Sequence, residues 1–325
     1  VAILHCNAQS SASSLHEALH AHCVLVSSAK GRVFRPKNKD NLVLYLKGMN
    51  LPTPDKYGTS EMLAMVHQLL TYQGFYDPNF EWIGIENVQI IGSMSVSTDA
   101  SAQSIPTRVL SLFRICLMDP PTNEDLNLIS SAFLTPILET SLNSPQRTTM
   151  IGSMMVNIFS QVKTTFKSTE HSHYVFTPKD LTKWIVSLMR YELTSDPEFV
   201  QKALLYESQR IFGDRLVSTD DKQRFDNILM EEARAGSKKD DSVFASQSLA
   251  VHTKDSVGIP LVSIPSVDYE STLKKVVNRY EFEVANFKLP LLKEVQAFAA
   301  KVDRVLTTPG GSLLLAGRSG MGRKD

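Results

Sequence analysis

The order of short apolar runs along the chain is the feature that most restricts its fold. In residues 1–120, apolar runs of strand length alternate with segments that have helical spacing. The runs are Val1–Leu4, Cys23–Ser27, Leu42–Leu46 and Val88–Ile91. In Ser60–Leu70, apolar side chains instead recur at i, i+3 and i+4, as on the buried face of a helix. Strands that alternate with helices predict an α/β fold around a mostly parallel sheet.

From about Asn123 to Met230 the pattern indicates helices alone. One helix is predicted to begin at Thr177-Pro178-Lys179-Asp180. Thr177 can cap the free N–H groups, a proline suits the first helical position, and Asp180 favours the positive end of the helix dipole. The sequence therefore predicts an α/β part followed by a separate helical subdomain.

The stretch between residues 233 and 265 has a different composition. It contains the charge run Lys238–Asp241, many serines and alanines, and little periodicity, so we expect a mobile surface linker. Order is predicted to resume at a helix over Leu291–Leu306, followed by a strand over Ser312–Ala316. The inward face of that helix is expected to comprise Leu292, Val295, Phe298, Ala299, Val302 and Leu306.

A glycine-rich turn follows the predicted strand at Ser312–Ala316. A phosphate loop is written G-x-x-x-x-G-K-[ST], because backbone N–H groups of a tight glycine turn surround phosphate oxygens. The candidate phosphate-binding residues are Gly317, Arg318, Ser319, Gly320, Gly322, Arg323 and Lys324. Arg323 replaces the motif's lysine, and Lys324 replaces the hydroxyl residue that ligates magnesium. The motif alone fits either a degenerate phosphate loop or a plain glycine turn.

Composition excludes several other classes of protein. Lys plus Arg and Asp plus Glu each count 34, so no net charge favours nucleic acid or anionic lipid. No apolar run reaches the roughly 18 residues of a membrane span. The three cysteines have no metal-ligand spacing, and their sparseness indicates a reducing cytosolic compartment. His171 and His173 have no neighbouring Cys or carboxylate cluster, so we expect no metal site.

Both ends of the chain suggest a fragment. The opening Val-Ala-Ile-Leu-His has the character of a strand interior, and Asp325 comes directly after a glycine turn that should lead into a helix.

Several blocks of sequence resemble one protein family. Asn50–Thr59 (NLPTPDKYGT) resembles the segment after the Walker B strand in the third AAA+ module of dynein heavy chains. The similarity continues, in family order, at Leu70–Tyr76, Thr177–Trp184, Glu207–Val217 and Val302–Gly322. The motifs GRVFRPK, LYLKGMNLP and GGSLLLAGRSG are most similar to the cytoplasmic type-two heavy chains, the retrograde motors of intraflagellar transport.

The resemblance implies an AAA+ P-loop-type module with a helical lid. Residues 1–122 would be the large α/β part and residues 123–232 the lid. Residues 233–285 would be a variable linker, and residues 286–325 would open the next module, including its first strand and its degenerate phosphate loop. The phosphate loop of the first module would precede Val1.

The resemblance also assigns roles to individual positions. Lys47 and Gly48 occupy the Walker B positions, where an Asp supports magnesium and a Glu polarises the attacking water. Ser95 matches the first-sensor position and Lys179 the second-sensor position. Arg108 matches the arginine that reaches the neighbouring module's nucleotide. No catalytic set is intact, so we expect no ATPase activity from this fragment alone.

The resemblance further implies the setting of the parent protein. It would be an ATP-driven, minus-end-directed microtubule motor that uses ATP, ADP and magnesium. Its partners would be neighbouring AAA+ modules, dynein intermediate and light chains and microtubules, in the cytoplasm, the cytoskeleton and the axoneme of the cilium or flagellum. The fragment contains no coiled-coil stalk. The alternatives are a nucleotide-free AAA+ spacer or interaction module and, disfavoured by Lys47 and Gly48, a stand-alone AAA+ ATPase.

Overall fold

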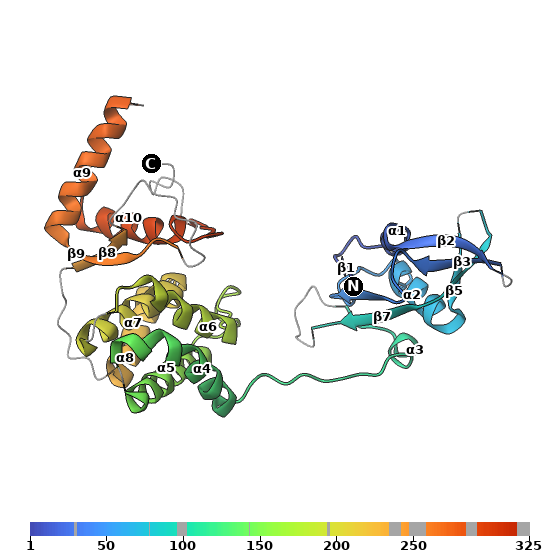
Figure 1. Ribbon diagram of the computed structural model, residues 1–325, viewed down its shortest axis with the longest axis horizontal. Helices are drawn as coiled ribbons and strands as arrows, with labels where there is room; N and C mark the ends of the chain where they lie inside the picture. The colour runs from blue at the N-terminus through green and yellow to red at the C-terminus, as the bar shows by residue number, and fades with distance from the viewer. Residues whose placement is uncertain are drawn as a thin grey trace. The chain divides into compact units, whose positions relative to one another are not determined.

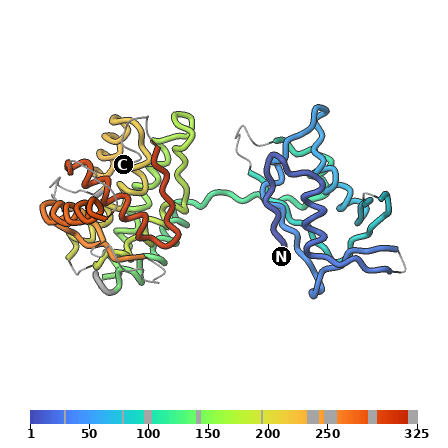
Figure 2. Tube along the Cα trace, turned by 90° about the horizontal axis from the view of Figure 1, so that it is seen from above, coloured from blue at the N-terminus to red at the C-terminus, as the bar shows by residue number. Residues whose placement is uncertain are grey.

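The computed structural model divides the chain into two compact units, Val1–Met118 and Asp119–Asp325 (Figures 1 and 2). It describes residues 1–28, 31–77, 79–95, 103–142, 144–193, 196–233, 242–246, 258–283 and 291–316. Each unit has its own hydrophobic core and is treated by itself below.

The first unit is built around a parallel sheet. Its elements are β1 (Ala2–His5), α1 (Ala12–His22), β2 (Cys23–Ser28), β3 (Gly31–Pro36), β4 (Leu42–Lys47), α2 (Glu61–Tyr72), β5 (Gly74–Tyr76), β6 (Trp82–Ile85), β7 (Val88–Ser93) and α3 (Thr107–Leu110). Strands β1, β4 and β7 pair in that order, and both pairings are parallel. Leu44 and Leu46 of β4 are buried with the apolar faces of α1 and α2. The predicted α/β fold with a parallel sheet is confirmed.

A second sheet of the first unit has the order β2-β3-β6-β5. Cys23–Ser27, predicted as a strand, lies in this sheet as part of β2 and pairs antiparallel with β3. The β3–β6 pairing is parallel and carries two ion pairs at its surface, Arg32 with Glu81 and Arg35 with Glu86. These strands are partly exposed and charged, so they lack the continuous apolar runs that marked β4 and β7.

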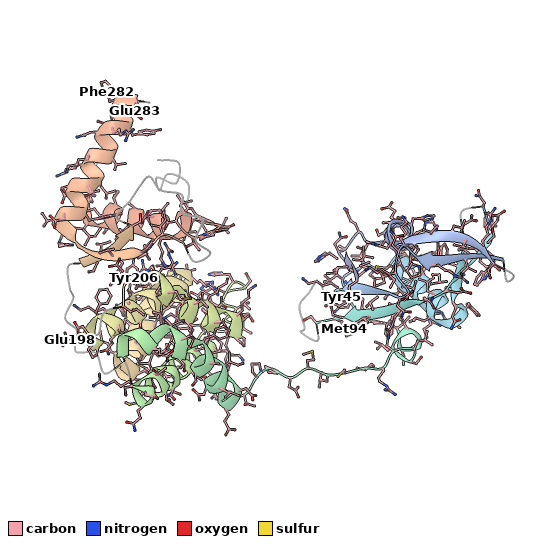
Figure 3. All side chains as sticks on the ribbon, viewed as in Figure 1. Tyr45, Met94, Glu198, Tyr206, Phe282 and Glu283 are labelled. Carbon is pink, nitrogen blue, oxygen red and sulfur yellow. The ribbon has the colours of Figure 1, made fainter. Side chains whose placement is uncertain are left out.

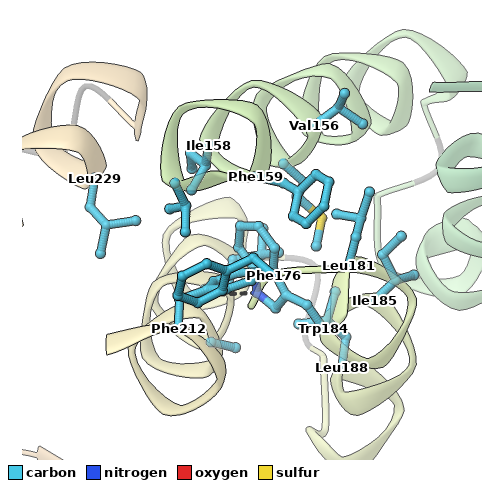
Figure 4. Close-up of a cluster of buried hydrophobic side chains, with 14 of the residues drawn as sticks. Val156, Ile158, Phe159, Phe176, Leu181, Trp184, Ile185, Leu188, Phe212 and Leu229 are labelled. Atoms are coloured by element: carbon cyan, nitrogen blue, oxygen red, sulfur yellow. Dashed lines mark hydrogen bonds between the residues drawn. The ribbon is translucent and has the colours of Figure 1, made fainter. Parts of the chain in front are cut away.

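The second unit begins with a helical bundle. Its helices are α4 (Asn123–Leu142), α5 (Pro145–Thr165), α6 (Pro178–Ser187), α7 (Pro197–Ile211) and α8 (Thr219–Ala233), with 3₁₀ turns η1 (Leu188–Arg190) and η2 (Gly213–Arg215). Figure 4 shows Phe176, Trp184 and Phe212 at the centre of its core, surrounded by these helices. The predicted helical subdomain is confirmed. Helix α6 begins at Pro178 as predicted, because Thr177 and Asp180 form a capping box.

Asp180 has a second role, which yields a prediction about pH. It is buried, and Arg215 Nη2 donates to its Oδ1 at 2.6 Å. Burial raises the pKa of the Asp180 carboxyl, but hydrogen bonds from Arg215 and Thr177 outweigh burial and hold that pKa below its ordinary value. Because the folded-state pKa is lowered, the carboxylate stabilises the fold above its unfolded-state pKa of about 4. This stability is lost as the pH falls through the folded-state pKa.

We therefore expect Asp180→Asn to lower the free energy of unfolding by about 1 to 3 kcal/mol at pH 7. The difference from the unsubstituted chain should shrink as the pH falls below about 4. Urea unfolding at pH 7 and pH 3 measures both effects. Asp220→Asn, at the exposed start of α8, is the control and should change little. An equal loss at both pH values would contradict the prediction.

Residues 242–265 contain regular structure that the sequence did not predict. Strands β8 (Ser242–Ser246) and β9 (Leu261–Pro265) pair antiparallel, and Phe244 and Leu261 are buried in the core of the helical bundle. The expectation of a linker without regular structure is therefore wrong for Ser242–Ser246 and Leu261–Pro265, while residues 247–257 lie outside the described residues. Each strand is only five residues long, and their partners are distant in sequence, so no periodicity marked them. Lys238–Asp241 lies outside the described residues.

Helix α9 (Ser266–Glu283) and helix α10 (Lys293–Leu306) complete the second unit. The free end of α9 carries Phe282 and Glu283 (Figure 3), and Phe282 is fully solvent-exposed at 93%. Helix α10 is confirmed, but its predicted inward face is wrong in part. Phe298 and Leu306 are 51% and 69% exposed, because α10 instead turns Gln296 and Ala300 inward.

The predicted strand at Ser312–Ala316 is not formed, and Leu314 is 90% exposed. A β-strand needs a hydrogen-bonded neighbour, and no described strand pairs with these residues.

Candidate functional site

The carboxyl ends of the three parallel strands meet at one edge of the first unit. In the register of the sheet, His5 of β1 lies beside Lys47 of β4, which lies beside Ser93 of β7. Open α/β sheets bind ligands just beyond the carboxyl ends of their strands. The Lys47 side chain is exposed there. This carboxyl edge is therefore the candidate site.

The chain turns tightly after β4 and is fixed to both neighbouring strands. The N–H groups of Gly48 and Met49 both donate to the Ser93 carbonyl, at 3.0 and 2.9 Å. The Lys47 carbonyl accepts from the Cys6 N–H at 2.9 Å. Gly48 has a φ of +77°, and a Cβ added there would lie 2.8 Å from Leu51 Cδ1. The turn therefore requires glycine both for its backbone conformation and for its lack of a side chain.

Ser93 and Asn50 contribute to the edge, and the sequence reasoning missed both. The Tyr45 hydroxyl donates to Ser93 Oγ at 2.9 Å, and Figure 3 shows Tyr45 near Met94 at this end of the sheet. Asn50 is buried, and its Nδ2 donates to the carbonyl of Ser95 at 3.0 Å. Only the pairing register of β4 with β7 identifies Ser93 as the neighbour of Lys47.

The chemistry of this edge favours an anion over a metal ion. Magnesium is held by oxygen ligands, chiefly carboxylates. The residues at the end of β4 supply an ammonium group at Lys47 and no side chain at Gly48, so they do not fit magnesium. Within the described parts of the chain, no group of three His, Cys, Asp or Glu side chains could hold a metal ion. The exposed ammonium group suits phosphate oxygens.

The remaining predicted site residues lie elsewhere. Arg108 is exposed on α3, a short helix anchored by the buried Val109. Lys179 is exposed in the first turn of α6 and belongs to the second unit. The structure thus brings Lys47, Gly48 and Ser95 to one edge. The candidate residues Gly317, Arg318, Ser319, Gly320, Gly322, Arg323 and Lys324 lie outside the described residues.

Restoring a glutamate at Gly48 is expected to destabilise the first unit. A left-handed φ disfavours a side chain, and Leu51 would have to move, so Gly48→Glu should lower the free energy of unfolding by about 1 to 3 kcal/mol. Gly58→Glu is a matched control, because Gly58 has a φ of +78° but no atom within 4 Å of its added Cβ. Its loss should be about 1 kcal/mol. Urea unfolding measures both, and a larger loss at Gly58 would contradict the explanation.

These features define a P-loop-type α/β module followed by a helical lid, and the comparisons agree. Residues 1–121 match the family described as "P-loop containing dynein motor region". Residues 133–222 match "Dynein heavy chain, ATPase lid domain".

Whole-chain relatives carry the same family name. The chain is 42% identical to cytoplasmic dynein 2 heavy chain 1 of Caenorhabditis elegans over 330 residues, which cover 100% of this chain. It is 37% identical to the Homo sapiens protein of that name, over 355 residues, and 33% identical to that of Chlamydomonas reinhardtii, over 334 residues. The chain belongs to the dynein heavy chain family. It spans about 8% of the length of these relatives.

The comparisons confirm the resemblance drawn from Asn50–Thr59 and the other blocks, including the similarity to type-two cytoplasmic heavy chains. They carry no information on the roles of single residues, so those of Lys47, Gly48, Ser95, Arg108 and Lys179 stay predictions. Among the helices that the structure describes, none is both long and apolar enough to cross a membrane.

Proposed function

We propose that this chain is a non-hydrolysing, nucleotide-responsive or structural segment of a dynein motor ring. The observation that carries the proposal is the end of β4, where Lys47 and a left-handed Gly48 stand in the Walker B positions. Hydrolysis of ATP requires a metal ion that offsets charge and a group that orients the water. Neither residue can do that work, and the backbone at Gly48 also resists a glutamate.

Retention of nucleotide is compatible with this loss of chemistry. Lys47 offers a cation at the carboxyl edge, and Lys179 is the proposed second-sensor residue. A ligand that binds only the folded state stabilises it by mass action without any reaction. Bound ATP or ADP would then be a structural ligand of this module, while hydrolysis with magnesium takes place elsewhere in the parent motor.

Arg108 is proposed to serve the neighbouring module rather than its own. It is exposed on α3, and an arginine that reaches a neighbour's nucleotide must be free to leave its own module. Such an arginine stabilises the charge that develops on transferred phosphate. Ser95 is the proposed first-sensor residue.

The role of the whole protein is proposed from its relatives. Their names support a cytoplasmic dynein 2 motor. Its activity would be ATP-driven, minus-end-directed movement in retrograde intraflagellar transport. Its partners would be the adjoining AAA+ modules, intermediate and light chains and microtubules, and its location the cytoplasm, the cytoskeleton and the ciliary axoneme.

The test uses a full motor domain in which the catalytic glutamates of the other modules are replaced by glutamine. We expect no appreciable ATP turnover, and we expect nucleotide to be released from this module when the protein is denatured. Lys47→Ala should reduce the amount released, because it removes the cation at the carboxyl edge. ATP turnover that persists and then disappears in Lys47→Ala would overturn the proposal. Release of no nucleotide would favour the nucleotide-free spacer.

A further inference from the structure

Arg190, at the end of η1 in the lid, is a buried cation with only 4% of its surface exposed. Its Nη1 donates to the Arg304 carbonyl and to Thr308 Oγ1, both at 2.7 Å. Its Nη2 donates to Thr307 Oγ1 at 2.7 Å and to the Ile259 carbonyl at 3.1 Å. Its Nε donates to the same Ile259 carbonyl at 3.2 Å. The five N–H groups of the guanidinium therefore all have acceptors.

Most of these acceptors belong to the carboxyl end of α10. Arg304 lies in the last turn of the helix, and Thr307 and Thr308 follow directly. The last carbonyls of a helix lack intrahelical partners and carry partial negative charge. Arg190 supplies a positive charge at this end and a hydrogen bond to the Arg304 carbonyl, which also accepts from the Thr308 hydroxyl. It acts as a cap for α10 that comes from a different part of the chain.

A second contact holds the side chain of the same turn. Arg304 donates through Nε to Oε1 of Glu207 at 2.7 Å, and through Nη2 to the other carboxylate oxygen. Glu207 lies on α7 and is fully buried, and it also accepts from the Tyr191 hydroxyl at 2.6 Å. The lid thus contacts the last turn of α10 in two ways. Arg190 binds the backbone carbonyl of Arg304, and Glu207 binds the side chain of Arg304.

The buried apolar contact of α10 is with β8 and α9 rather than with the lid, because Ala300 lies in a cluster with Ala245 and Tyr269. The large apolar residues of α10, Phe298 and Leu306, are exposed, and among its apolar side chains only the small Ala300 is buried. The apolar anchors between the lid and the following segment, Phe244 and Leu261, lie on β8 and β9 instead. The orientation of α10 against the lid must therefore depend on its charged and polar contacts.

We propose that Arg190, Glu207 and Arg304 form a polar latch by which the lid fixes the position of helix α10. The latch is a property of the second unit alone. The latch requires no nucleotide, so a test of the latch and a test of the proposed function can have different outcomes.

Hydrogen–deuterium exchange of the 325-residue chain tests the latch. In Arg190→Lys, three rotatable donors replace a planar set of five, so the four acceptor atoms of Arg190 cannot all be satisfied. We expect the amides of the last two turns of α10 to exchange at least about tenfold faster, because local opening of the helix becomes easier. The amides of α5 and α6 should keep their rates.

A second variant approaches the latch from the α10 side. Arg304→Lys keeps the positive charge but cannot make the paired contact with both oxygens of Glu207, and it leaves the lid unchanged, so it tests the latch even if Arg190→Lys fails to fold. It should also accelerate exchange in α10, by about three- to tenfold. The control is Lys301→Gln, because Lys301 pairs with Asp214 at a half-exposed position of the same interface. Its effect should stay below about twofold.

Two results would overturn the latch. One is unchanged exchange in α10 in both variants. The other is acceleration of α5, α6 and α10 by the same factor, which would indicate general loosening of the unit.

Discussion

Replacing Trp184 with alanine is expected to lower the free energy of unfolding of the second unit by about 3 to 5 kcal/mol. Trp184 is fully buried at the centre of the lid core, with its ring edge-on to Phe212 at a centroid distance of 5.5 Å. Its Nε1 donates to the Leu204 carbonyl at 3.0 Å, so the side chain also ties α6 to α7. The substitution removes the packing, the bond and the ring contact together, and it leaves a cavity between helices.

The chain offers a matched control, because it contains two tryptophans and they lie in different units. Trp82 is 38% exposed at the start of β6 in the second sheet of the first unit, where it packs over Gly74. Trp82→Ala should lower stability by only about 1 to 2 kcal/mol, because less apolar surface is lost. Hydrogen–deuterium exchange in increasing urea follows the amides of each unit separately, so each loss is measured in the unit that carries the substitution. Equal losses for both variants would contradict the assignment of Trp184 to the lid core.

The sequence predicted the parts of the fold whose stability comes from continuous apolar burial. Leu42–Leu46 is buried between helices, so its apolar run was a reliable sign of β4. The start of α6 was predictable because Thr177 and Asp180 satisfy backbone groups only three residues away. In both cases the pattern that signals the element is local in the sequence.

The parts that were not predicted depend on contacts between residues distant in the chain. Strand β3 pairs with β6, and the ion pair of Arg32 with Glu81 joins residues 49 positions apart. Phe244 and Leu261 are buried in the lid core, but the residues before and after them in the sequence show no regular spacing of apolar side chains. For α10, the sequence predicted the helix correctly but predicted some exposed side chains to be buried. Amphipathic spacing indicates a helix but does not show which side meets a partner.

The candidate site also has parts that the sequence predicted and parts that only the structure revealed. The resemblance assigned Lys47 and Gly48 to the Walker B positions, and the identities of these two residues already predict the loss of hydrolysis. The positive φ of Gly48 and the register that places Ser93 beside Lys47 required coordinates. The contact of Arg190 with Thr308 spans 118 residues, and no sequence pattern marks it.

Replacing Glu207 with alanine is the other substitution for which a large effect is expected, a loss of about 3 to 5 kcal/mol in the second unit. Glu207 is a fully buried carboxylate that accepts from Arg304 and from the Tyr191 hydroxyl. Its removal leaves a largely buried guanidinium and a buried hydroxyl without their acceptor. An uncompensated charge in the interior is far more unfavourable than the loss of one surface pair.

The combination of Glu207→Ala with Arg304→Met separates the penalty of the orphaned charge from the loss of the ion pair. The double variant lacks the Arg304 guanidinium that Glu207→Ala leaves without its acceptor, so it should recover about 1 to 3 kcal/mol relative to the sum of the two single losses. Asp214→Asn, at the half-exposed pair with Lys301, serves as the reference and should change stability by less than about 1 kcal/mol. Urea unfolding followed by fluorescence, in a Trp82→Phe background that leaves Trp184 as the only tryptophan, supplies all four values. A loss in the double variant equal to the sum of the two single losses would show that Glu207 and Arg304 stabilise the unit independently. That result would contradict an energetic role for the contact between α7 and α10.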